Sequence, residues 1–169
     1  MANYDVLCFL EYYADRSNVL SGSNRNPTYQ WQNFYQNVQT LGSADTNAQG
    51  DYRYLAFDVD GFGSTDASSI NDLSIELAAT AEIIDITDSA LGADNLVIAS
   101  LYVQSAGSDA FDTSSAQLIS RYIGSIEGAS VTETTVSWTV NPAINKLNPQ
   151  VPSRKITANM VDKNNKLYV

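Results

Sequence analysis

Alternating apolar and polar positions run through most of this sequence and predict a chain built mainly of β-strands. The clearest run holds Leu73, Ile75 and Leu77 at spacing two, with polar residues between them. That period is typical of a strand with one face on a core. Residues 95–104 are nearly apolar on both faces, so we expect a central strand there. The predicted strands cover residues 4–13, 28–38 (with a bulge where the phase slips), 52–59, 72–78, 95–104, 117–126, 133–140 and, last and shortest, 154–161.

The period changes to three or four over residues 81–91, which predicts one short amphipathic helix. Thr80 can cap its N-terminus, and Glu82 lies in the first turn, near the positive end of the helix dipole. Gly92 follows directly, as expected where a helix ends.

Turn-forming residues separate these elements. Glu127-Gly128-Ala129-Ser130 predicts a hairpin turn between the last two long strands, and three Xaa-Pro pairs beginning at Asn141-Pro142 break up an irregular segment over 141–169. Flexible loops are expected at about 15–27, 40–50 and 105–116. No internal repeat is visible, so we predict one domain over residues 1–169: a mainly β barrel or sandwich of seven or eight strands with one short flanking α-helix.

Composition excludes several kinds of chemistry. The 169 residues include no His and one Cys, Cys8. The sequence therefore cannot form a Ser-His-Asp triad, a Cys-His nucleophile pair or an imidazole zinc ligand. It also cannot form an intrachain disulfide or a cysteine-held iron–sulfur cluster. No positively charged start leads into an apolar run, so we expect no signal peptide, and no apolar run reaches the length of a membrane span.

The charge is acidic and unevenly distributed. Nine Lys and Arg against 19 Asp and Glu give a formal net charge of −10, and residues 1–120 hold 16 of the acids but three of the bases. One interpretation is a solvated acidic face followed by a slightly basic tail. The other is self-association, in which the basic end of one copy, including Lys146, Arg154 and Lys155, meets the acidic face of the next.

The segment Phe57-Asp58-Val59-Asp60-Gly61 is the first candidate for chemistry. It resembles the first motif of the haloacid-dehalogenase phosphotransferases, in which the first Asp attacks a phosphoryl group. Position 62 is Phe where that family usually has Thr or Val, no later Gly-Asp…Asp motif follows, and the fold would have to be parallel α/β. We therefore expect no phosphotransferase here.

The same segment fails as a calcium loop, because Phe62 stands at position 5 and Ser69 replaces the bidentate Glu at position 12. A looser metal site through Asp58, Asp60 and Asp66 stays open. The simpler interpretation is that Asp58 and Asp60 end a strand and solubilise its exit. Three helix acids, Glu82, Asp85 and Asp88, are interpreted as a solvated helix face.

Aromatic residues offer a surface rather than an active site. The chain has ten Tyr, and Tyr is favoured at protein interfaces because it buries a large area at low entropic cost. The cluster of Tyr29, Trp31, Phe34 and Tyr35 is therefore a candidate assembly interface, although strands also favour Tyr for packing. Exposed Tyr and Trp would alternatively suit a carbohydrate- or host-surface-binding β-sandwich.

The order of features from about residue 28 to residue 161 resembles the minor tail protein L family of lambda-like long-tailed phages. The matching pieces are the Trp-Gln-centred YQWQNFYQNV, then YRYLAFDVDGFGSTDASSINDLSIELAAT, the helix and central strand of AEIIDITDSALGADNLVIASLYV, and QLISRYIGSIEGASVTETTVSWTVNPAINKLNPQVPSRKITANMV with its Pro-Ser-Arg. Members often continue into a cysteine-rich domain with an iron–sulfur cluster. With Cys8 alone, this chain corresponds to the first domain, and no cofactor is implied.

The resemblance implies a tail-tube-like fold and a non-enzymatic virion protein, assembled in the host cytoplasm. It would form a trimeric or hexameric ring at the distal tail or hub, joining tail tube to tip or baseplate around the channel through which DNA passes without specific binding. A tail-tube or tube-adaptor protein of the same fold is the alternative. The residues expected at assembly interfaces are Tyr29, Trp31, Phe34, Tyr35, Asp58, Asp60, Phe62, Lys146, Arg154 and Lys155.

Overall fold

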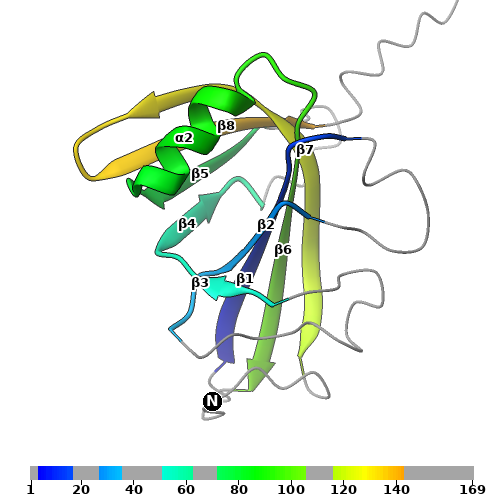
Figure 1. The fold of residues 1–169 in the computed structure, drawn as a ribbon. Coiled ribbons are helices and arrows are strands. Elements are labelled where there is room, and N and C mark those ends of the chain that lie inside the picture. Colours follow the sequence, from blue (N-terminus) through cyan, green and yellow to red (C-terminus); the bar gives the residue numbers. More distant parts are fainter. Residues whose placement is uncertain (1–3, 17–26, 36–50, 63–71, 106–115, 143–169) are drawn as a thin grey trace, which may run out of the picture.

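One curled, eight-stranded sheet and one short helix make up the part of the chain that can be described (Figure 1). The computed structural model describes residues 4–16, 27–35, 51–62, 72–105 and 116–142. The strands are β1 (Tyr4–Tyr13), β2 (Tyr29–Gln32), β3 (Arg53–Tyr54), β4 (Phe57–Asp60), β5 (Leu73–Ala78), β6 (Leu96–Ser105), β7 (Gln117–Val131) and β8 (Thr135–Pro142), and the helix is α2 (Ala81–Ala90). The prediction of a mainly β fold with one short helix is confirmed, as a single half-barrel sheet rather than two stacked sheets.

The strand order is β3-β2-β1-β6-β7-β8-β5-β4, and every neighbouring pair is antiparallel except β2 and β3. β6 lies between β1 and β7, and its ten-residue ladder with β1 runs from Tyr4 opposite Ser105 to Tyr13 opposite Leu96. This central position confirms what the two apolar faces of residues 95–104 predict.

The two edge strands, β3 and β4, belong to one stretch of chain. Between them, the Leu55 amide donates to the Gln32 carbonyl (3.0 Å), while the Ala56 carbonyl accepts from the Ala78 amide (2.9 Å). The stretch thus contacts β2 on one side and β5 on the other, and it holds the two ends of the sheet close enough to curl. The strand expected over 52–59 is consequently split at Leu55–Ala56 into two short pieces.

The main core lies inside the curl, and α2 covers one end of it (Figure 1). Ile83, Ile86 and Ala90 of α2 are buried in this core. The indole Nε1 of Trp138 on β8 donates a 2.8 Å hydrogen bond to Oγ1 of Thr87 on α2. The buried apolar face of α2 and one buried hydrogen bond therefore hold the helix against the sheet.

The helix ends match the sequence prediction. Thr80 is the N-cap, and its Oγ1 accepts from the Ile83 amide at 3.3 Å. Glu82 lies in the first turn, and Gly92 just beyond the helix has φ = +82°. Such a left-handed backbone is easiest for glycine.

The hairpin predicted at Glu127–Ser130 is wrong, because β7 continues to Val131. The chain turns at residues 132–134, where the Thr132 Oγ1 accepts from the Thr135 amide at 2.9 Å. Gly128 instead follows a register shift between β7 and β8, a role for which glycine is also suited. The strand expected over 133–140 continues to Pro142, which lies opposite Gly124 and is the last residue of β8, and the rest of the segment expected to be irregular lies outside the described residues.

β2 is shorter than the strand expected over 28–38. The strand ends at Gln32, and Asn33 makes two further bonds to β1: its amide donates to the Cys8 carbonyl at 3.1 Å, and its Oδ1 accepts from the Cys8 amide at 2.9 Å. The strand expected at 154–161 and most of the three expected loops lie outside the described residues. Among the described residues, no helix is long and apolar enough to cross a membrane.

Candidate functional site

Large apolar side chains are exposed where β1, β6 and β7 extend beyond the core, at the end of the sheet away from α2 (Figure 1). β1 and β7 begin there and β6 ends there, with Val6 opposite Val103 and Leu118 opposite Tyr102. Val6 and Ile119 are each 59% exposed. The set comprises Tyr4, Val6, Leu118 and Ile119, and we call it the projecting apolar end.

Sequence reasoning missed the projecting apolar end. Tyr4 and Val6 belong to the run at 4–13, whose apolar character predicts burial. Which end of a strand overhangs a core depends on the lengths of its neighbours, and a single strand pattern does not carry that information. Ile119 is the extra residue at a register shift between β6 and β7, since Ser120 pairs with Leu101 and Leu118 with Tyr102.

The four predicted aromatic interface residues are in different environments. Tyr29 and Trp31 stack with centroids 5.4 Å apart and planes 4° from parallel, but Trp31 is buried in the main core. Phe34 packs edge-on against Phe9 at 5.4 Å. Among the four, Tyr35 alone is highly exposed, at 86%. Its ring packs edge-on against Tyr54, which is itself exposed, with the ring centroids 5.2 Å apart. Of the four, Tyr35 offers most surface to a partner.

Asp58 and Asp60 are exposed on β4, and their carboxylates accept from the Val59 and Gly61 amides at 2.9 and 2.8 Å. Gly61 has φ = +107°, which explains the glycine at this bend. Phe62 is partly buried against the main core. Within the described segments no group of three acidic, Cys or His side chains is arranged to hold a metal ion, and Asp66 lies outside those segments.

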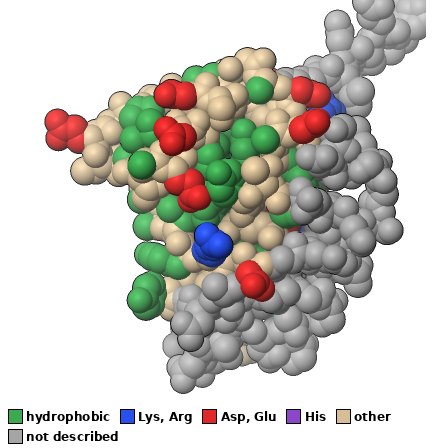
Figure 2. All heavy atoms as spheres, in the orientation of Figure 1, with side chains coloured by type: hydrophobic (Ala, Val, Ile, Leu, Met, Phe, Trp, Pro, Cys, Tyr) green, Lys and Arg blue, Asp and Glu red, His purple; other side chains and the backbone are tan. Residues whose placement is uncertain are grey.

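Acidic side chains outnumber basic ones on the face drawn in Figure 2. On the solvent side of the β4–β5 pair, Asp58 lies directly opposite Glu76, and both are exposed. Lys146, Arg154 and Lys155, the expected basic counterpart, lie outside the described residues.

A buried carboxylate on the outer face of the sheet is a second feature that sequence reasoning missed. Glu11 is 1% exposed, and its two oxygens accept from the Tyr13 hydroxyl (2.5 Å) and the Tyr52 hydroxyl (2.8 Å). Burial, followed by the nearby Glu11 charge, raises the pKa of Tyr52. The available signal was an acid, Glu11, placed between Leu10 and Tyr12 in the apolar part of the run YDVLCFLEYY. Each carboxylate oxygen has a phenol donor, so the arrangement is typical of a structural tie.

Cys8 is buried, and burial raises the pKa of its thiol to about 12. The thiolate, the reactive form, is therefore scarce at neutral pH. Cys8 belongs to the core rather than to a nucleophilic site.

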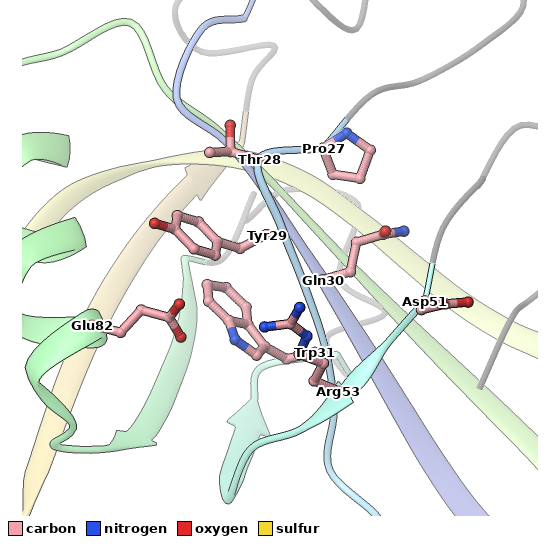
Figure 3. Close-up of a pocket in the computed structure, with 8 residues that line it drawn as sticks. All are labelled: Pro27, Thr28, Tyr29, Gln30, Trp31, Asp51, Arg53 and Glu82. Atoms are coloured by element: carbon pink, nitrogen blue, oxygen red, sulfur yellow. The ribbon is translucent and has the colours of Figure 1, made fainter. Parts of the chain in front are cut away.

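A pocket of ≈ 240 Å³ opens beside the Tyr29–Trp31 stack (Figure 3). Its walls come from the start of β2, from the stretch entering β3 and from the first turn of α2. The lining residues are Pro27, Thr28, Tyr29, Gln30, Trp31, Asp51, Arg53 and Glu82. No protein-family model matches this chain, and no curated protein matches it.

Proposed function

We propose that this chain is a structural subunit of the distal tail or hub ring of a phage tail, joining the tail tube to the tip or baseplate around the DNA channel. The identity of the assembly rests on the sequence resemblance. The observation that carries a role in assembly is the projecting apolar end. Large apolar side chains are exposed on both faces of this end of the sheet, with Val6 on one face and Leu118 on the other, and exposed apolar side chains gathered in one region favour a site covered by another protein.

The partner at this surface is a second copy of the chain. Tyr4 and Val6 on β1, and Leu118 and Ile119 on β7, flank β6 at the same end of the sheet. A closed ring, trimeric or hexameric, would cover such strand ends on every subunit. The exposed Tyr35 offers a further contact.

The exposed acids have a function in such a ring. Asp58, Asp60 and Glu76 share the solvent side of the β4–β5 pair, and carboxylates facing a channel would repel DNA phosphates, so the genome would slide without sticking. Basic side chains at 146, 154 and 155 would dock on an acidic neighbour.

Charge placed in the projecting apolar end tests its role. The double variant Val6→Glu with Ile119→Glu is compared with Val131→Glu, which alters a similarly exposed residue at the other end of β7. Light scattering after size exclusion should give a ring mass for wild type and Val131→Glu, and the mass of one 18.4 kDa chain for the double variant. A double variant that assembles like wild type would show that this surface is not the interface.

A tail-tube or tube-adaptor protein of the same fold would also expose apolar strand ends. The two differ in how rings associate: a tube subunit gives long stacks, whereas a hub or distal-tail subunit gives rings of fixed height. Negative-stain images of the assembled protein separate them.

A further inference from the structure

The pocket beside the Tyr29–Trp31 stack follows from the one parallel pair of strands in the sheet. β2 and β3 are paired only at Trp31 with Arg53 and at Gln32 with Tyr54. Before these positions residues 27–30 and 51–52 diverge, and the first turn of α2 contributes Glu82 to the resulting pocket (Figure 3). The walls of the pocket are thus held in place by the paired strands β2 and β3 and by the capped first turn of α2.

Two charged side chains reach into this pocket from different elements. In Figure 3 the carboxylate of Glu82 points from α2 toward the aromatic stack, and the guanidinium of Arg53 lies beside Trp31. No hydrogen bond or ion pair joins either group to the rest of the part of the chain that the structure describes. One strong donor and one strong acceptor therefore remain available to a ligand.

The charges in the pocket select against ionic ligands. A phosphate or carboxylate near Arg53 would also meet Glu82 and Asp51, while an ammonium group near Glu82 would meet Arg53. A neutral ligand that both accepts and donates hydrogen bonds avoids this conflict, and vicinal hydroxyls do both.

The remaining wall is aromatic. Tyr29 is half-buried and covers one face of Trp31, so it presents part of its ring to the pocket. The apolar C–H face of a sugar ring packs well on such a surface, because both lose water-exposed apolar area. The volume of ≈ 240 Å³ lies below the range of about 300–1,000 Å³ typical of drug-sized ligands, which limits the ligand to about one ring.

We propose that this pocket binds one neutral sugar ring, with hydroxyls accepting from Arg53 and donating to Glu82 while the ring packs on Tyr29. This binding is additional to the proposed role in a ring assembly and does not depend on it. A tail subunit with such a pocket would contact glycans at the host surface.

Saturation-transfer NMR on the full chain tests the proposal. The probes are glucose, galactose, mannose and N-acetylglucosamine, with glucuronate and glucosamine as charged counterparts. We expect transfer to at least one neutral sugar, and weaker transfer to its charged counterparts. Glu82→Gln and Arg53→Gln should each weaken binding about tenfold or more, because each replaces a charged hydrogen-bonding group with a neutral amide.

Asp85→Asn, on the same helix but outside the pocket lining, is the matched control and should bind as wild type does. Arg53, Glu82 and Asp85 are all exposed, so the variants should fold, which near-ultraviolet circular dichroism checks. The proposal is overturned by no transfer to any neutral sugar at tens of millimolar, or by transfer that both pocket variants leave unchanged. Neither result bears on the proposed ring assembly, because that proposal is tested by the mass of the oligomer in solution.

Discussion

Asp58 and Glu76 lie directly opposite each other on β4 and β5, and both carboxylates face solvent. Like charges at directly opposed positions of an antiparallel pair are destabilising. The chain therefore has a repulsion between two carboxylates on this face.

Replacing Glu76 with Gln should stabilise the folded chain by about 0.2–1 kcal/mol, because it removes that repulsion. Chemical denaturation at low salt measures the change, which should shrink as added salt screens the two charges. Glu133→Gln, in the turn before β8, is the control and should have little effect. A Glu76→Gln protein no more stable than wild type at low salt would contradict the argument.

Gly124 and Gly128 on β7 should respond differently to the same substitution. A Cβ at Gly124 would lie 2.3 Å from the Asn141 carbonyl oxygen, whereas at Gly128 the nearest atom, on Thr139, is 3.8 Å away. Gly124→Ala should therefore destabilise the protein by about 2–3 kcal/mol, and Gly128→Ala should change little. Thermal unfolding of the two variants checks this, and equal losses would mean that β7 and β8 do not approach as described.

The buried Glu11 carboxylate should act as one unit with its two phenol donors. Glu11→Ala leaves the Tyr13 and Tyr52 hydroxyls without this acceptor and should cost about 3 kcal/mol, while Tyr52→Phe should cost about 1–2 kcal/mol. The double variant should lose less than the sum of the two. Urea unfolding of all three gives the cycle, and strict additivity would show that Glu11 and Tyr52 are not coupled.

Cys8 makes stability depend on pH in the alkaline range. Burial raises the pKa of its thiol from 9.0 to about 12, so the folded chain holds a proton that the unfolded chain releases. This contribution to the free energy of unfolding is complete below pH 9.0 and falls by about 1.4 kcal/mol per pH unit between pH 9.0 and about 12.

Raised pKa values of Tyr52 and Tyr122 act in the same direction. The measurement is therefore the free energy of unfolding of wild type and of Cys8→Ala as a function of pH. Above pH 9.0 the free energy of unfolding of Cys8→Ala should decline less steeply than that of wild type. Parallel curves would place Cys8 in contact with water.

Local sequence patterns predicted the elements whose form depends on local residues. The alternation of Leu73, Ile75 and Leu77 gave the buried face of β5, and Thr80 with Gly92 gave both ends of α2. Gly128 was misinterpreted because a turn and a bulge both favour glycine, and only the pairing partner distinguishes them.

Features set by distant contacts could not be predicted. The split at Leu55–Ala56 arises because Gln32 and Ala78 bond the same stretch from two sides. The pocket depends on where β2 and β3 diverge and on which side chain α2 contributes there. Val6 is exposed because the start of β1 extends beyond the core.

Negative-stain imaging of the purified full-length chain tests the central claim most directly. A subunit of a distal tail or hub ring should form closed rings of uniform diameter with a central opening, at trimeric or hexameric mass. A uniform population of single 18.4 kDa particles at high protein concentration would contradict it.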